Sequence, residues 1–417
     1  MTAPAFSLVF CVFVAAALAW RTLLGVRQMR HVALHRDRVP DDLAAFISLE
    51  AHRKAADYTR DKQRAGLVET LAIDAVVLLA LTVGGGIAAI DQLSERAFGE
   101  GYARELATVF GVFLTITLLA LPFDIWRTFA VESRYGFNRT TPRLFAIDLA
   151  KGALLAVALG TPLLLAVFWL VQAAGPYWWF YTWLAWIAFT VVLVMVFPRW
   201  IAPLFNRFTP LEEGDLRRRI ESLIERCGFH AKGLFVMDGS RRSSHGNAYF
   251  TGFGAEKRIV FFDTLIDRLS TPEIEAVLAH ELGHFARGHI PRLLAVRFAL
   301  ALLLLAILGW LYREPAFYEA LGLPGPHIGA ALAGFALIIP VFTFPFQPLA
   351  SLLARRQEFE ADAFAAQHAS AADLASALAK LYRDNASTLT PDPLHSLVYD
   401  SHPPAALRID HLRRSAP

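Results

Sequence analysis

Five consecutive residues, His280-Glu281-Leu282-Gly283-His284, have the types and spacing needed to hold a metal ion and use it for hydrolysis. Two histidines four positions apart leave the same face of a helix, so both imidazoles can bind one ion. Glu281, beside the first histidine, can reach a water molecule at that ion and take its proton. A chance HExxH in a chain of this composition is about a one-in-a-hundred event. We therefore expect a catalytic site with one Zn²⁺ per chain, bound by His280 and His284, with Glu281 as the general base.

A catalytic zinc site needs a third protein ligand, which must come from elsewhere in the chain. His289 follows the second histidine too closely to be that ligand, and is expected at a helix end or an interface. Residues 357–365 place Glu358 and Asp362 four apart, on one face of a second helix. Glu358 is expected to bind zinc, and Asp362 to accept a hydrogen bond from a ligand histidine. Glu360, between them, is expected to face solvent.

The residues before HExxH are typical of the start of a helix. Ser270 or Thr271 can cap it, Pro272 suits its first turn, and Glu273 lies near the positive end of the helix dipole. The rest of this polar segment is expected to contain a helix at 216–227 and short strands at 234–237, 247–252 and 258–262.

The composition of the whole chain indicates a membrane protein. Of its 417 residues, 55% are hydrophobic and only 18% are charged, whereas soluble domains are about a quarter charged. This excludes disordered, fibrous and disulfide-scaffold proteins, and Cys11 and Cys227 form no CxxC pattern. The net charge of +3 gives no sign of nucleic acid binding.

Seven stretches approach or exceed the roughly 20 apolar residues that a membrane helix needs. They are 6–24, 68–90, 106–126, 149–173, 178–200, 293–312 and 328–353. The first could instead be a cleaved signal peptide, but no Lys or Arg precedes it, which favours a retained helix. The expected fold is mainly α, with about seven transmembrane helices and a cytoplasmic zincin-like α+β domain.

The distribution of positive charge predicts the orientation of these helices. Ten Lys and Arg lie between residues 21 and 64, but only two between residues 65 and 105. The positive-inside rule then puts the N-terminus outside and the C-terminus and catalytic segments in the cytoplasm. Two predicted spans separate HExxH from Glu358, so both halves of the site fall on one side. The expected parts are a first span with its basic connector (1–67), spans two to five (68–205), a catalytic segment (206–291), spans six and seven (292–354) and a C-terminal catalytic segment (355–417).

Ionisable residues within the predicted spans are costly in lipid, so they are expected to face protein or water. Asp74 is the deepest, whereas Asp124, Asp148 and Lys151 lie nearer the ends of their spans.

Together these features resemble the type I CAAX prenyl proteases, which are integral-membrane zinc metallopeptidases of the gluzincin class. The resemblance extends nearly end to end. It is carried by HELGH, by EFEAD at 358–362, and by the segments 48–58, 132–141 (ESRYGFNRTT) and 203–211 (PLFNRFTPL). It implies a helical barrel around a water-filled chamber, with zinc at its cytoplasmic rim. It also implies removal of the -aaX tripeptide from prenylated CaaX proteins.

The resemblance assigns a role to several residues. The family's zinc ligands, catalytic glutamate and supporting acid match His280, His284, Glu358, Glu281 and Asp362. Asn247 matches a substrate-binding edge segment, and His402 and Arg408 match a pair near the scissile carbonyl. From the residues alone, Asn247 could equally be a turn residue, His402 a surface histidine and Arg408 a structural ion-pair residue.

Two other functions remain open at this point. A quality-control membrane zinc protease is one, although such proteases have fewer spans. The other is a membrane transporter or a metal-binding structural protein, and Glu281 argues against it because a structural zinc site has no use for that carboxylate. The expected partners are a peptide or protein substrate, prenylated or not, and the lipid bilayer, with no nucleic acid.

Overall fold

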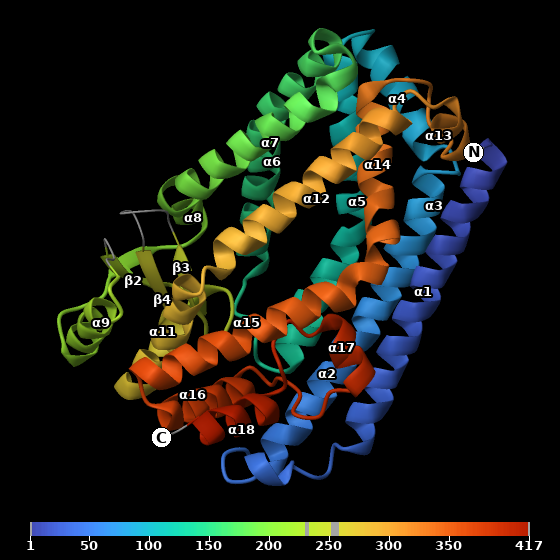
Figure 1. The fold of residues 1–417 in the computed structure, drawn as a ribbon. Helices are drawn as coiled ribbons and strands as arrows, with labels where there is room; N and C mark the ends of the chain where they lie inside the picture. The colour runs from blue at the N-terminus through green and yellow to red at the C-terminus, as the bar shows by residue number, and fades with distance from the viewer. Residues whose placement is uncertain (1, 230–232, 252–257, 416–417) are drawn as a thin grey trace.

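The structure is a computed structural model that describes residues 2–229, 233–251 and 258–415, and it is dominated by long helices (Figure 1). The long helices and the elements between them are α1 (Ala3–Leu34), η1 (Asp41–Leu43), α2 (Leu49–Glu69), η2 (Thr70–Val77), α3 (Leu78–Leu81), α4 (Gly86–Phe98), α5 (Tyr102–Trp126), η3 (Arg127–Glu132), α6 (Pro142–Ala173), η4 (Gly175–Tyr177), α7 (Trp178–Val196), η5 (Phe197–Ile201), α8 (Ala202–Phe205), α12 (His289–Leu311), α13 (Pro315–Ala320), α14 (Ile328–Thr343), η8 (Phe344–Phe346) and α15 (Gln347–His368).

The remaining elements gather at one end of the molecule, around a small sheet (Figure 1). They are β1 (Phe208–Pro210), α9 (Asp215–Arg226), β2 (Gly233–Met237), η6 (Gly239–Arg241), β3 (Ala248–Thr251), β4 (Arg258–Phe262), α10 (Asp263–Ile266), α11 (Thr271–Ala286), α16 (Ala371–Asp384), α17 (Pro393–Tyr399) and α18 (Ala405–Ser415). The strand order is β1-β2-β4-β3, with β2 parallel to β4 and β3 antiparallel to it. The three predicted strands are therefore present, with Gly252 outside the described residues, and β1 is an additional strand.

Among the described residues, six helices are long and apolar enough to cross a membrane. A seventh span is obtained if Leu49–Leu81 and Gly86–Phe98, which meet at a bend of 59°, count as one. The chain breaks there at three consecutive glycines, and Gly85 adopts φ +76°, a conformation that favours glycine. The mainly α, multi-spanning fold is thus confirmed, with one predicted span broken.

We call the end of the molecule that carries the sheet, α11, α16 and α18 the catalytic end, after the catalytic segments predicted there (Figure 1). The α15 helix continues from the apolar region into this end without interruption from Gln347 to His368. Glu358 is therefore held by the same helix that begins among the membrane-spanning segments. This continuity fixes the third predicted ligand relative to the barrel.

The catalytic end has its own hydrophobic core, in which α11 is central. Fully buried Phe261 of β4 and Leu282 of α11 belong to it, together with Leu223 of α9. Leu43 and Ile47, from the basic connector after α1, are buried in the same core. The connector is therefore packed onto the catalytic end.

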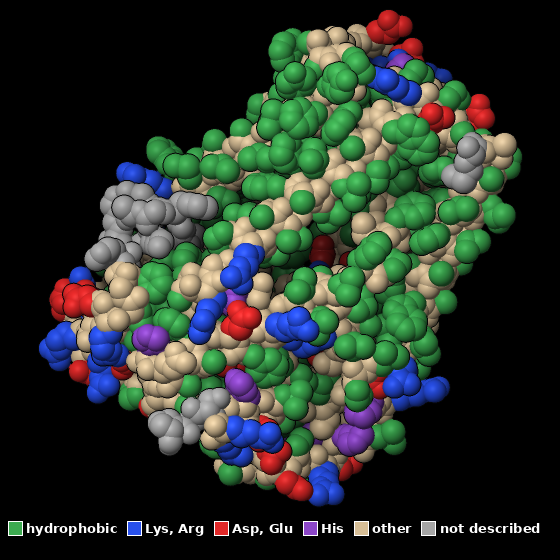
Figure 2. All heavy atoms as spheres, in the orientation of Figure 1, with side chains coloured by type: hydrophobic (Ala, Val, Ile, Leu, Met, Phe, Trp, Pro, Cys, Tyr) green, Lys and Arg blue, Asp and Glu red, His purple; other side chains and the backbone are tan. Residues whose placement is uncertain are grey.

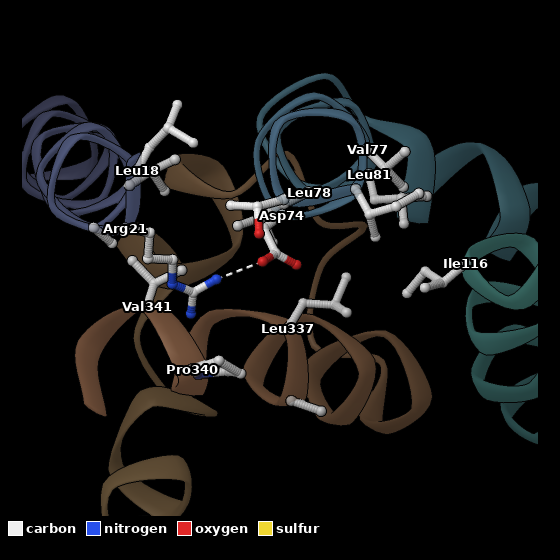
Figure 3. Close-up of a pocket in the computed structure, with 15 residues that line it drawn as sticks. Leu18, Arg21, Asp74, Val77, Leu78, Leu81, Ile116, Leu337, Pro340 and Val341 are labelled. Atoms are coloured by element: carbon white, nitrogen blue, oxygen red, sulfur yellow. Dashed lines mark hydrogen bonds and ion pairs between the residues drawn. The ribbon is translucent and has the colours of Figure 1, made fainter. Parts of the chain in front are cut away.

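Hydrophobic side chains cover much of the outer face of the long helices, and charged side chains gather at the catalytic end (Figure 2). The surface is hollowed between α12, α14 and α15, with acidic atoms at depth (Figure 2). Asp74 of η2 forms an ion pair with Arg21 of α1 in a cavity with otherwise mainly apolar walls (Figure 3). Asp124 pairs with Arg127, and Asp148 pairs with Arg242. The polar residues of the predicted spans thus meet protein partners, as their cost in lipid requires.

Candidate active site

The helix that carries HExxH, α11, has a well-defined start. Ser270 and Glu273 form a capping box, in which the Glu273 carboxylate accepts a hydrogen bond of 2.8 Å from the Ser270 N–H. Glu273 also accepts hydrogen bonds from Ser376 Oγ at 2.7 Å and Lys380 Nζ at 2.8 Å. Burial alone would raise the pKa of Glu273, but the hydrogen bonds from Lys380 and Ser376 outweigh it and lower the pKa. The start of α11 is thereby tied to α16.

Gly283 allows α11 and α15 to approach closely. A Cβ atom at this position would lie 2.9 Å from Ala361 Cα and 3.0 Å from the Ala361 carbonyl oxygen. Only glycine fits without a shift of backbone. The contact brings the face of α15 that carries Glu358 against the two histidines of α11.

His280, His284 and Glu358 converge as predicted. The Nε2 atoms of the two histidines lie 3.2 Å apart. Glu358 places Oε2 3.5 Å from His280 Nε2 and Oε1 3.3 Å from His284 Nε2. Within the described part of the chain, these three residues form a group that could hold a metal ion, with their ligand atoms within 4.8 Å of one another. We refer to them as the candidate metal-binding group.

The donor atoms fit a divalent metal ion. Zinc bonds of roughly 2.0–2.2 Å in a tetrahedral arrangement place neighbouring ligands about 3.3–3.6 Å apart, close to the separations seen here. Glu358 is 6% exposed, and its Oε2 makes no well-oriented hydrogen bond among the described residues, although Arg408 Nη1 lies 3.0 Å away. A buried carboxylate oxygen that lacks a well-oriented hydrogen bond is suited to bind a metal ion.

Asp362 supports the first histidine. Its Oδ1 lies 2.8 Å from His280 Nδ1, and its two oxygens accept hydrogen bonds of 2.6 and 2.8 Å from Arg408. Asp362 is fully buried and Arg408 is 4% exposed. A ligand histidine whose second ring N–H is bound by a carboxylate has a fixed tautomer and ring orientation. Arg408 is thus a buried ion-pair residue that also lines the adjoining cleft.

His289 and Glu360 form a chain of contacts that begins at His284. His289 Nδ1 is 2.9 Å from His284 Nδ1, and its Nε2 is 3.0 Å from Glu360 Oε2. His289 is at the start of α12, as expected, and it contacts His284, one of the predicted metal ligands. The expectation that Glu360 faces solvent holds only in part, since its half-exposed side chain pairs with His289.

A cleft of about 490 Å³ opens beside the candidate metal-binding group. Glu281, Asn247, His402 and Arg408 all line it, so every residue implied by the resemblance is brought to one place. His402 Nε2 lies 3.4 Å from Glu358 Oε1. Desolvation raises the pKa of Glu281 above its ordinary value. A carboxylate whose pKa is raised is a stronger proton acceptor than an ordinary glutamate, which suits a general base.

The strand β3 forms one edge of the sheet and of the cleft. It pairs with β4 on one side, and no described strand pairs with its other side. Asn247 precedes β3, and its Oδ1 accepts a hydrogen bond of 2.8 Å from the next residue's N–H. This is the local contact of a turn residue, made at the mouth of the cleft.

The sequence analysis missed a polar cluster that supports this edge. The Asn385 Oδ1 accepts hydrogen bonds of 3.2 Å from the Gly246 N–H and lies 3.2 Å from His245 Nδ1. Glu132 lies 3.6 Å from the His245 ring and accepts a 2.6 Å hydrogen bond from Tyr58. Tyr58 and Glu132 belong to two of the segments that carry the family resemblance, which was the available signal. Their meeting at the cleft could not be read from the sequence.

Two family models match the chain over nearly its whole length. Residues 28–207 match the model described as the CAAX prenyl protease N-terminal region with five membrane helices, and residues 210–416 match peptidase family M48.

Individual proteins and one solved structure are similar over equally long regions. The chain is 36% identical to the CAAX prenyl protease 1 homolog of Arabidopsis thaliana, over 95% of each protein. It is 31% identical to the human CAAX prenyl protease 1 homolog, over 94% of this chain and 92% of that protein. The crystal structure of S. mikatae Ste24p matches with a TM-score of 0.90 and 32% identity, covering 97% of this chain and 98% of that one.

Proposed function

The chain belongs to peptidase family M48 as a membrane metalloendopeptidase of the CAAX prenyl protease type, and we propose that it cleaves prenylated C-terminal peptides with a zinc ion. The ligands in this proposal are His280, His284 and Glu358. The observation that carries it is the convergence of these three side chains, with Glu281 beside them in the same cleft.

Each residue of the site has its own role in peptide hydrolysis. When bound, zinc supplies the Lewis acidity that activates a water molecule and polarises the peptide carbonyl. Glu281 takes the proton of the attacking water at its carboxylate and returns it to the leaving amine. His402, which lines the cleft and lies next to Glu358, is placed to donate a hydrogen bond to the oxyanion that develops on the carbonyl. Asp362 keeps the ring of His280 oriented, and Arg408 holds Asp362 and borders the substrate.

The substrate peptide lies extended along β3. The edge of this strand with which no described strand pairs offers backbone N–H and C=O groups to a peptide that adds to the sheet. Asn247, exposed at the start of that edge, contacts the substrate at the mouth of the cleft. A peptide bound in this way passes the metal with its backbone fixed, which suits cleavage near a flexible C-terminus.

The membrane part suits a lipid-modified substrate. A prenyl group partitions into the bilayer, so the peptide attached to it stays close to the membrane surface. We place the catalytic segments, 206–291 and 355–417, on the cytoplasmic side of the spans in 68–205 and 292–354, with the connector of 1–67 packed beside them. In this arrangement the bilayer holds the prenyl group while the cleft receives the peptide.

Cleavage of matched peptides tests both the metal and the substrate class. Two CaaX peptides of the same sequence, one farnesylated and one not, are incubated with purified protein and the products are identified by mass. We expect release of the -aaX tripeptide, faster from the farnesylated peptide, and loss of activity after chelation that returns when Zn²⁺ is added. Cleavage that persists in verified metal-free protein would refute the zinc mechanism. Equal rates for the two peptides would refute the prenylated substrate and leave the peptidase intact.

A further inference from the structure

We propose that His289 and Glu360 form a positioning relay that holds the metal ligand His284 in its binding orientation. This inference rests on the metal site proposed above. The relay consists of two short contacts in series, 2.9 Å between the Nδ1 atoms of the histidines and 3.0 Å from His289 Nε2 to Glu360 Oε2.

The chemistry of the two rings fixes the direction of both hydrogen bonds. His284 Nε2 points to Glu358 and His280, so it is the atom that binds the metal as a lone-pair donor. Its proton therefore resides on Nδ1 and is donated to Nδ1 of His289. His289 accepts there, so its own proton lies on Nε2 and is donated to the Glu360 carboxylate. Each atom has one compatible role, and the tautomer of His284 that binds metal is the one the relay selects.

The two ligand histidines differ in the group that accepts the hydrogen bond from their second ring nitrogen. His280 donates to Asp362, which is fully buried and held by Arg408. His284 donates to a neutral ring, and the charge at the far end, Glu360, is 48% exposed. Water screens an exposed carboxylate, so the ring of His289 should contribute more to the orientation of His284 than the charge of Glu360 does.

The local fold holds His289 in a fixed, buried position beside His284. Gly288 adopts φ +65°, which turns the chain sharply between α11 and α12 and returns His289 to the ligand only five residues before it. His289 is the first residue of α12 and is 2% exposed. Glu360 comes from α15. The relay therefore joins α11, the start of a membrane-spanning helix and the helix of the third ligand.

Metal affinity measured on His289 variants tests the relay directly. His289→Leu keeps the buried volume and removes the acceptor. His289→Asn keeps an oxygen close to the position of Nδ1. Zn²⁺ affinity is measured by competition with a chelator of known strength, and the visible spectrum of Co²⁺-substituted protein reports ligand geometry. We expect His289→Leu to bind Zn²⁺ about 10–100-fold more weakly with a changed Co²⁺ spectrum, and His289→Asn to recover most of the affinity.

Glu360→Ala provides a second variant at a half-exposed position, in case the buried substitution prevents folding. Its Zn²⁺ affinity should fall, by less than in His289→Leu. Arg356→Ala, an exposed change one turn earlier on α15, is the matched control and should bind like the wild type. Wild-type affinity and an unchanged Co²⁺ spectrum in both His289→Leu and Glu360→Ala would overturn the relay, as would equal losses in His289→Leu and His289→Asn. Wild-type protein that binds no Zn²⁺ would instead overturn the metal site itself.

Discussion

Glu281 is the residue whose chemical role can be isolated most cleanly, because it lines the cleft without being a metal ligand in the proposed site. Glu281→Gln keeps the shape of the side chain and removes the oxygen that accepts a proton. Zinc content should stay normal, since His280, His284 and Glu358 are unchanged. Single-turnover cleavage should fall by about 10²–10⁴-fold or more, the range of general acid–base catalysis.

The control for this prediction is Glu275→Gln on the same helix. The side chain of Glu275 is 13% exposed and pairs with the half-exposed Arg219 and Arg226. Glu275→Gln should cleave at the wild-type rate, because Glu275 is not among the residues that line the cleft. Near-normal cleavage by Glu281→Gln with normal zinc would show that another group is the base.

Site residues that belong to a short motif in the sequence could be predicted, whereas residues that meet only through the fold could not. HExxH fixes three of them within one helix turn, and Glu358 and Asp362 repeat the same four-residue spacing. The partners of His284 were missed because their contact depends on the turn at Gly288 and on the meeting of Glu360 of α15 with His289, the first residue of α12. Neither leaves a periodic signal in the sequence.

At the scale of elements, the fit of α11 against α15 depends on Gly283. In Gly283→Ala the added Cβ would meet backbone of Ala361 at 2.9 Å, so the helices must move apart. The shift would carry Glu358 away from the histidines. We expect weaker Zn²⁺ binding and lower activity, with a larger effect on metal affinity than on helix content measured by circular dichroism.

Gly152→Ala is the comparison variant, because a Cβ there meets nothing within 4 Å in the middle of α6. It should be neutral or stabilising by up to about 1 kcal/mol, as alanine favours a helix over glycine. If Gly283→Ala bound Zn²⁺ as tightly as Gly152→Ala, the close approach of α11 and α15 would not be what positions Glu358.

The cap of α11 predicts how the stability of the catalytic end varies with pH. The pKa of Glu273 is lowered in the folded protein, so its contribution is complete above its unfolded pKa of about 4.3 and is lost as pH falls through the lower folded value. Glu273→Gln should lower the melting temperature at pH 7, and the difference from wild type should shrink in acid. A difference that stays constant from pH 7 to pH 3 would contradict this account.

The sequence predicted the secondary structure correctly where a clear hydrophobic pattern is present. The prediction failed for a very short strand and for a helix that is broken by glycines. The predicted strands at 234–237 and 258–262 match β2 and β4, but β1, only three residues long, was not predicted. The run at 68–90 is apolar enough for one span, yet its three glycines divide it into two helices. Hydropathy registers glycine as nearly neutral and so cannot detect such a break.

At the scale of the whole molecule, the family resemblance predicted the overall architecture, and ion pairs explain how the barrel tolerates charge. Arg21 with Asp74, and Arg127 with Asp124 and Glu69, join α1, α2, η2, α5 and η3 within the membrane part. The sequence indicated that Asp74 and Asp124 need partners, but not which ones. Pairing between distant helices follows from the three-dimensional arrangement, and a single sequence carries no direct record of it.

The orientation of the molecule in the membrane gives the last prediction. The N-terminus lies at the opposite end from the sheet and the C-terminus (Figure 1). The predicted seven spans would produce this arrangement. Ten Lys and Arg between residues 21 and 64 lie at or before the start of the second span, and their basic connector packs into the core of the catalytic end. From the positive-inside rule we therefore predict that the connector and the catalytic end lie together in the cytoplasm. A reporter fused after Pro417 should be cytoplasmic, and one inserted between residues 313 and 327 should be outside. Finding both on the same side would require an even number of spans between them and would exclude the seven-span arrangement, whereas an exchange of the two locations would invert it and place peptide cleavage outside.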